Sequence, residues 1–214
     1  MSAELFSRLD QIIAQFDDGL RTLFAPAPRA ERENPAQGVA AVDLVDAERQ
    51  LSARLMRVNH AGEVCAQALY RGQAATAQTP GVRQKLAQSA AEENDHLAWT
   101  GARINELGSH TSCLNPIWYG GSLMIGALAG LAGDKWSLGF VAETERQVVA
   151  HLNGHLARLP ARDQASRAVL EQMCKDEGHH ATVAIEAGAA PLPTPARRLM
   201  RLAAKIMTRT AYWI

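Results

Sequence analysis

The sequence contains little of what many small proteins use to stabilise a fold or to reach a compartment. Its three cysteines, Cys65, Cys113 and Cys174, lie far apart and form no Cys-x-x-Cys pair. This pattern argues against a disulfide framework and against a thiolate zinc site. The N-terminus, MSAELFSRLDQII, lacks the basic start and the apolar run of a signal peptide. We therefore expect a reducing, cytoplasmic setting.

Aromatic residues and strand-like patterns are also scarce. Only 5% of the residues are aromatic although 47% are hydrophobic, and no segment alternates apolar and polar residues as a half-buried strand does. The 214 residues are enough for one domain with a full core. We expect a single all-α domain.

Charge is absent from one segment and one-sided in another. Residues 111–133 carry no charge, but glycines interrupt them and they are only moderately apolar. We therefore expect a buried or membrane-surface helix there, not a spanning one. The spacing Gly126-x-x-x-Gly130 in this segment would let two helices approach closely. Residues 187–214 carry five cations and no acid, which leaves the rest of the chain with five net negative charges.

The basic C-terminal segment has the pattern of a helix that lies in a membrane interface. Its apolar residues form one stripe, made of Leu199, Leu202, Ala203 and Ile206. Its cations form a second stripe, made of Arg198, Arg201, Lys205 and Arg209. Tyr212 and Trp213 are residue types that favour the headgroup level. We expect a peripheral protein on the cytoplasmic face of the cell membrane; the alternative is that this helix and the uncharged one only pack on the bundle.

Proline and glycine breaks set the organisation of the chain. Residues 1–40 predict an amphipathic helix over 4–24 and a proline-rich, charged linker over 25–38, and residues 41–214 form the main domain. Within it, helical spacing predicts two hairpins, 43–107 and 135–186, with turns at Thr79-Pro80-Gly81 and at Pro160. The uncharged segment connects them. The prediction is a ferritin-like four-helix bundle with one long crossover connection.

Acids and histidines recur at matching places in the two hairpins. Each second helix carries a Glu-x-x-His pair, and each first helix carries one glutamate at a similar distance from its turn. The spacing from one hairpin to the next is 82 residues for the single glutamates and 84 for the pairs, as in an internal duplication. These six residues are Glu63, Glu93, His96, Glu145, Glu177 and His180.

Four carboxylates and two imidazoles at one level predict a site for two adjacent cations, with iron or manganese preferred over a thiolate-seeking metal. The second pair has an alternative register, because Asp176 and His179 have the same spacing. Glu177 is preferred, since it reaches farther and matches the first pair. His60 is a candidate for a seventh ligand or, preferably, for a hydrogen bond to the ligands; His151 is a candidate for such a bond, and Tyr70 for the core or a pocket wall.

Several stretches together resemble the demethoxyubiquinone hydroxylase family of ferritin-like di-iron monooxygenases. They are RVNHAGEVCAQALYRGQ at 57–73, EENDHL at 92–97, AHLNGHL at 150–156 after Glu145, and DEGHHA at 176–181. The likeness runs from about Ala47 to the C-terminus, and its iron ligands fall on the six residues named above. The stretch AETERQ separates two acids that relatives often have adjacent, so Glu143 is an alternative; Glu145 is preferred because it stands six residues before His151.

The resemblance implies a metal-binding oxidoreductase of ubiquinone biosynthesis. It would hydroxylate a membrane-embedded, polyprenylated methoxy-methyl-benzoquinol with dioxygen, using two iron ions per chain, and would meet a lipid surface and other ubiquinone-biosynthesis proteins. Two further functions fit the same ligands: a ferritin-like iron oxidase or storage protein, which has no evident need of the basic tail, and a di-iron hydroxylase of tRNA. The acidic body argues against the latter and against any nucleic-acid partner.

Overall fold

The structure, a computed structural model of the chain, describes residues 10, 13, 17–25, 30–40 and 42–214. Over residues 42–214 the chain is helical and contains no strand, as the predicted all-α class requires. Residues 17–24 form a further helical stretch within the helix expected over 4–24, much of which lies outside the described residues. The long helices are α2 (Asp46–Thr76), α3 (Pro80–Glu106), α4 (Asn115–Leu131), α5 (Asp134–Leu156), α6 (Gln164–Glu186) and α7 (Thr194–Ala211).

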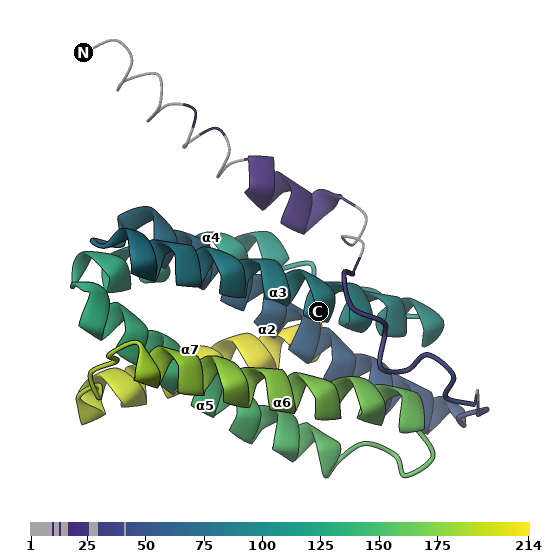
Figure 1. The fold of residues 1–214 in the computed structure, drawn as a ribbon. Helices are drawn as coiled ribbons and strands as arrows, with labels where there is room; N and C mark the ends of the chain where they lie inside the picture. The colour runs from purple at the N-terminus through teal and green to yellow at the C-terminus, as the bar shows by residue number, and fades with distance from the viewer. Residues whose placement is uncertain (1–9, 11–12, 14–16, 26–29, 41) are drawn as a thin grey trace.

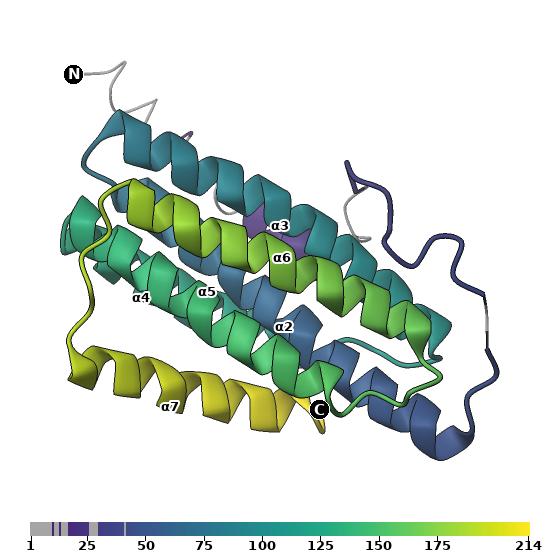
Figure 2. The same ribbon diagram turned by 60° about the horizontal axis from the view of Figure 1, so that its bottom comes forward.

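The bundle consists of two helical hairpins, α2–α3 and α5–α6, with α4 as the crossover between them (Figures 1 and 2). The turns fall where the sequence predicted them. Pro80 is the first residue of α3, and the Thr79 hydroxyl accepts a hydrogen bond from the backbone N–H of Val82. After Pro160, the Asp163 carboxylate caps α6 by accepting a hydrogen bond from the Ser166 N–H at 3.0 Å.

The crossover helix α4 is buried on one face only. Glycines allow this face to lie close to α2. A Cβ atom added at Gly72 of α2 or at Gly126 of α4 would clash with the backbone of the other helix. The Thr76 hydroxyl also donates a hydrogen bond across this contact to the carbonyl of Ala127, at 3.0 Å. The opposite face exposes large apolar side chains, namely Ile117, Met124, Ile125, Leu128 and Leu131. Of the helices described, none combines the length and the apolar character needed to cross a membrane.

Two apolar layers fill the interior at different heights. One contains Leu55, Met56, Trp99 and Leu170 near the α5–α6 turn. The other lies near the α2–α3 turn and contains Ala74, Leu86, Leu138, Val141 and Ala184. The ligand candidates occur between these layers along each of the four bundle helices, so the fold encloses a polar level between two apolar ones.

The C-terminal helix α7 is attached mainly by its end. Ala211 is fully buried, and Met207 packs with it against Val58 and Ala61 of α2. The predicted apolar stripe points away from the bundle, because Leu199, Leu202 and Ile206 are 66%, 55% and 54% exposed. The cationic residues on the second stripe are exposed too.

Candidate metal centre

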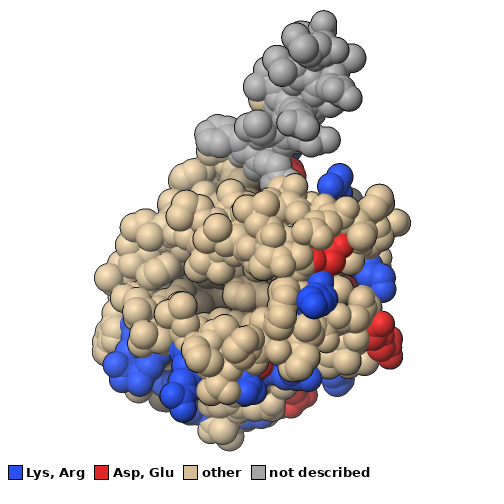
Figure 3. Space-filling model, turned by 90° about the vertical axis from the view of Figure 1, so that its left-hand side faces the viewer, with Lys and Arg blue, Asp and Glu red and all other residues tan. Residues whose placement is uncertain are grey.

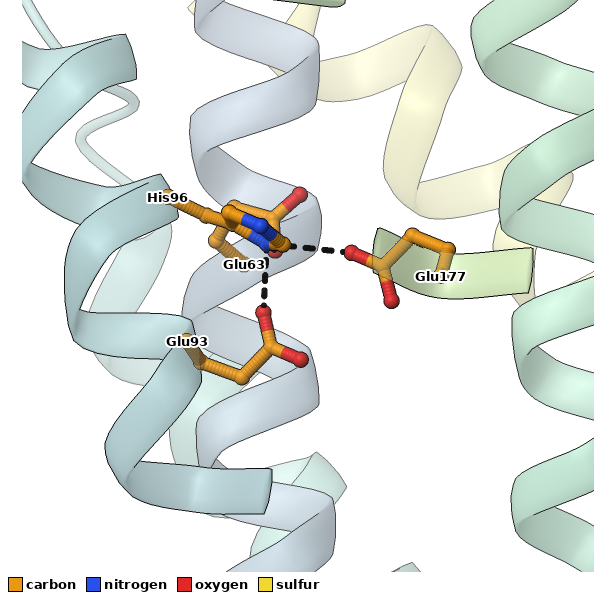
Figure 4. Close-up of side chains that lie close together, drawn as sticks. All are labelled: Glu63, Glu93, His96 and Glu177. Carbon is orange, nitrogen blue, oxygen red and sulfur yellow. Dashed lines mark hydrogen bonds and ion pairs between the residues drawn. The ribbon is translucent and has the colours of Figure 1, made fainter. Parts of the chain in front are cut away.

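Four ligand candidates from three helices meet in the polar level of the bundle (Figure 4). Glu63 comes from α2, Glu93 and His96 from α3, and Glu177 from α6. One ligand atom from each lies within 4.8 Å of all the others, and all four residues are buried. His96 is at the centre of the group: its Nδ1 atom is 3.0 Å from Glu93 Oε2 and 3.1 Å from Glu177 Oε1.

The other two candidates adjoin this group. His180 Nδ1 lies 3.2 Å from Glu177 Oε2 and 3.4 Å from Glu93 Oε1. Glu145 of α5 is buried and accepts a hydrogen bond from Tyr70, whose ring lies edge-on to that of His180 with the centroids 6.4 Å apart. The structure thus brings together all six residues that the sequence selected, one glutamate or one Glu-x-x-His pair from each bundle helix.

The spacing of three residues explains how each pair converges. Residues three apart share a helix face, so Glu93 and His96 aim at the same point, and Glu177 and His180 do the same. Within each pair the imidazole Nδ1 atom contacts the glutamate, at 3.0 Å and 3.2 Å respectively. The antiparallel hairpins then set the two pairs opposite each other.

Burial shapes the charge of the cluster. It raises the pKa of Glu63 and of Glu145 well above the usual carboxyl range, and nearby carboxylates raise both further. Burial alone would also raise the pKa of Glu93, but the charges of His96 and His180 outweigh it and lower that pKa. Burial lowers the pKa of His180, yet its contacts with Glu177 and Glu93 dominate and raise it to about 12. In the metal-free chain, protons bound to these carboxyl and imidazole groups therefore reduce the repulsion among the clustered acids.

The donor set fits hard or borderline divalent cations. Both Nδ1 atoms face the carboxylates, and Glu93 Oε1 is buried without a hydrogen bond among the described residues; its one ion-pair contact there is with His180 Nδ1, at 3.4 Å. Such an atom is costly to bury unless something positive satisfies it. Oxygen and imidazole ligands suit iron or manganese, and two divalent ions would balance four carboxylates. The cluster can therefore hold metal.

Two acids orient the histidines: Glu92, which sequence reasoning did not single out, and Asp176, which it considered only as an alternative ligand. Asp176 Oδ2 lies 2.9 Å from His96 Nε2, and Glu92 Oε2 lies 2.7 Å from His180 Nε2. The exchange is reciprocal, because each acid comes from the hairpin opposite its histidine. Bonds to the outer ring nitrogen fix the ring and leave Nδ1 free for a metal. The signal was present in the sequence: each acid directly precedes the glutamate of a Glu-x-x-His pair.

The alternative ligands lie elsewhere. His179 is exposed, and Asp176 faces the outer nitrogen of His96. Glu143 is buried, but its Oε1 atom accepts a hydrogen bond from Gln147 at 2.8 Å. Tyr70, expected in the core or a pocket wall, is buried and donates a 2.5 Å hydrogen bond to Glu145.

The two histidines expected to bond the ligands have other surroundings. His60 is buried, and burial lowers its pKa to about 4, so it is neutral; its Nδ1 has no hydrogen-bond partner within the described ranges. His151 packs against His155 with the ring centroids 4.0 Å apart and the ring planes tilted by 59°, and His155 Nδ1 lies 2.8 Å from Asn59 Oδ1. None of these contacts reaches the six-residue cluster.

Comparison with known proteins gives a consistent result. The sequence model of the family described as ubiquinone biosynthesis protein COQ7 matches residues 50–211. The chain is 58% identical over 214 residues to the 3-demethoxyubiquinol 3-hydroxylase of Nitrosococcus oceani, and all of both chains is covered. It is 58% identical over 206 residues to the protein of that name in Nitrosospira multiformis, covering 96% of this chain and 99% of the relative. It is 56% identical over 209 residues to the protein of that name in Acinetobacter baumannii, covering 98% of this chain and 99% of the relative.

Proposed function

Because the chain belongs to the ubiquinone biosynthesis protein COQ7 family, we propose that its buried cluster is a di-iron centre for hydroxylation of a polyprenylated methoxy-methyl-benzoquinol. The chain is an oxidoreductase of ubiquinone biosynthesis, and this role implies a quinol substrate and dioxygen. The relatives described above are named as hydroxylases, not for iron storage or tRNA modification.

The observation that carries the metal proposal is the convergence of six buried donors. When bound, a pair of iron ions supplies the redox chemistry that activates dioxygen. The protein's own contribution is positional. Asp176 and Glu92 hold the imidazoles with Nδ1 turned inward, and Tyr70 holds Glu145 by one oxygen. The apolar layers on either side restrict the access of water to this level.

Metal analysis of the purified protein tests the ligand assignment. We expect about two irons per chain in the wild type, because the constellation matches that of ferritin-like di-iron proteins. A variant with Glu93→Gln, His96→Ala, Glu177→Gln and His180→Ala should bind little or none. Iron content unchanged by these four substitutions would show that the ions, if present, are bound elsewhere.

A genetic experiment tests the reaction. Deletion of the gene, in cells without a second hydroxylase, should leave the demethoxy precursor in the lipid extract and little ubiquinone. Wild-type protein should restore ubiquinone, and the four-residue variant should not. Normal ubiquinone without the precursor in the deletion strain would contradict the proposal.

We also propose that the protein docks peripherally on the cytoplasmic face of the cell membrane, so that its substrate enters from the lipid. Support comes from the exposed apolar stripe of α7 beside its cations and from the exposed face of α4. Figure 3 shows the end of the bundle where α7 begins: much of it is uncharged around a central hollow, and Lys and Arg side chains gather along its lower edge.

Liposome flotation tests this docking. The full chain should float with anionic vesicles at low salt, less with neutral vesicles, and less after Leu199→Glu and Ile206→Glu, which place charge on the apolar stripe. As a control, Ile185→Glu charges another exposed apolar residue, on α6, and should float like the wild type. Full recovery of the wild type in the soluble fraction would refute membrane docking and leave the metal centre untouched.

A further inference from the structure

A short N-terminal segment crosses the contact between α3 and α6 directly behind the metal cluster. The Glu31 backbone N–H donates to Asp95 Oδ1 at 2.7 Å, and Arg32 Nε donates to Asp95 Oδ2 at 2.6 Å. Arg32 Nη1 also donates to Asp176 Oδ2 at 2.9 Å. One guanidinium thus joins an acid of α3 to an acid of α6.

Asp176 connects this arginine to the cluster. Its Oδ2 atom accepts from Arg32 and lies 2.9 Å from His96 Nε2, while its Oδ1 atom accepts from Gln172 at 2.9 Å. The carboxylate is therefore held from three sides. Arg32, Asp176 and His96 form a continuous chain from the N-terminal segment to a residue proposed to bind iron.

The geometry requires arginine in particular. The planar guanidinium uses two different nitrogens for two carboxylates and lies 4.7 Å from the centroid of the Trp99 ring. A lysine ammonium could approach either acid, but it has no second rigid donor and no planar face for Trp99. Asp95 is itself buried, and its hydrogen bonds within the described residues both come from this segment.

The two halves of the cluster differ at this point. Asp176, the acid that contacts His96, also forms an ion pair with Arg32. Glu92, the acid that contacts His180, forms no second ion pair within the described residues. Glu92 is also more exposed, at 41% of its side chain against 15% for Asp176. The duplicated ligand sets therefore have unequal support.

We propose that Arg32 is a positioning residue for the metal centre: it fixes Asp176 against His96 and so makes the metal position at His96 tighter than the one at His180. This inference rests on the proposed di-iron function. Loss of hydrogen-bond partners behind metal ligands weakens metal binding by about 10–100-fold, so we expect a loss on the order of ten-fold at one position when Arg32 is replaced.

The test is a titration of the metal-free, full-length protein with Co²⁺, followed by ligand-field absorbance and by calorimetry. The wild type should bind two ions with different affinities. Arg32→Gln should weaken one ion on the order of ten-fold and leave the other unchanged, and Arg32→Lys should recover only part of the loss. Arg49→Gln is the control, since Arg49 carries the same charge but pairs weakly with the exposed Asp46 at 3.9 Å.

A double variant separates positioning from general stabilisation. Asp176→Asn should weaken the same ion, and Arg32→Gln added to it should have little further effect, because both changes break one chain of contacts. Asp95→Asn weakens the attachment of the segment to α3, and the melting temperature of this variant measures how much that attachment contributes to stability. Wild-type affinities in Arg32→Gln, with or without a lower melting temperature, would overturn the inference alone. A wild type that bound no metal would overturn the di-iron proposal and this inference together.

Discussion

At the scale of single residues, the hydrogen bond from Tyr70 to Glu145 gives a clean prediction. Burial raises the pKa of the Tyr70 hydroxyl well above its usual value, so the group stays a donor. Tyr70→Phe leaves a buried carboxyl oxygen without this partner and should lower the free energy of unfolding by about 1–3 kcal/mol. Urea denaturation measures the change.

Tyr119 supplies the matched control for that measurement. It is also buried, but its hydroxyl has no hydrogen-bond partner among the residues described. Tyr119→Phe should therefore leave stability close to the wild-type value. Equal losses in the two variants would show that the ring environment, not the bond to Glu145, sets the effect.

Sequence spacing was sufficient for the residues that point inward and insufficient for those behind them. Glu93 and His96 were predictable because a helix fixes which side chains share a face. Asp176 and Glu92 directly precede the glutamates of the two pairs, but the spacing did not show which histidine each acid contacts, since their partners lie 80 and 88 residues away in the chain, across the docked hairpins. Arg32 was harder still: its segment predicted only a linker, and nothing in its composition indicates which helices it contacts.

At the scale of helices, the glycines between α2 and α4 can be tested one at a time. Gly126→Ala places a methyl group against the backbone of Leu69 and should destabilise the protein by about 1–3 kcal/mol, because neither helix backbone can yield cheaply. Thermal or urea unfolding measures this. Gly121→Ala, on the same helix but facing open space, should be neutral or stabilising by up to about 1 kcal/mol. Equal effects would mean that the helices can move apart.

Helix ends were predicted to within a few residues, since Pro80, Pro160 and Gly108 are local signals. The placement of α4 was not. Its glycines indicated close packing but not against which helix, and the sequence allowed either a buried or a membrane-surface helix. The structure buries one face, with glycines toward α2, and exposes the other, with large apolar side chains outward. Only the tertiary arrangement assigns the faces.

At the scale of the whole molecule, metal should decide how stability depends on pH. In the metal-free chain the folded pKa values of Glu63, Glu145, His96 and His180 are all raised above their unfolded values. Such groups stabilise the fold fully below the unfolded pKa, and this contribution is lost as pH rises through the folded pKa. The pKa of His180 is about 12, so above the unfolded histidine pKa of about 6.5 this residue alone should lower the free energy of unfolding by on the order of 1 kcal/mol per pH unit.

Urea unfolding between pH 6.5 and pH 9 measures this dependence. Chelator-treated protein should lose stability steadily across the range, whereas iron-loaded protein, kept anaerobic, should lose much less, because the ions replace the protons that hold the acids together. Parallel curves for the two forms would contradict the assignment of these four groups to the metal centre.

The reciprocal bonds between the hairpins also have a consequence for the order of events in time. Asp176 orients a histidine of the first hairpin and Glu92 one of the second, so a newly made hairpin holds neither imidazole in its final direction. In the proposed di-iron centre, iron should therefore be acquired late, after the C-terminal hairpin has left the ribosome and docked. In the mature protein, transient separation of the two hairpins would release both imidazoles from these acids, so the rate of metal loss should rise under conditions that favour such separation.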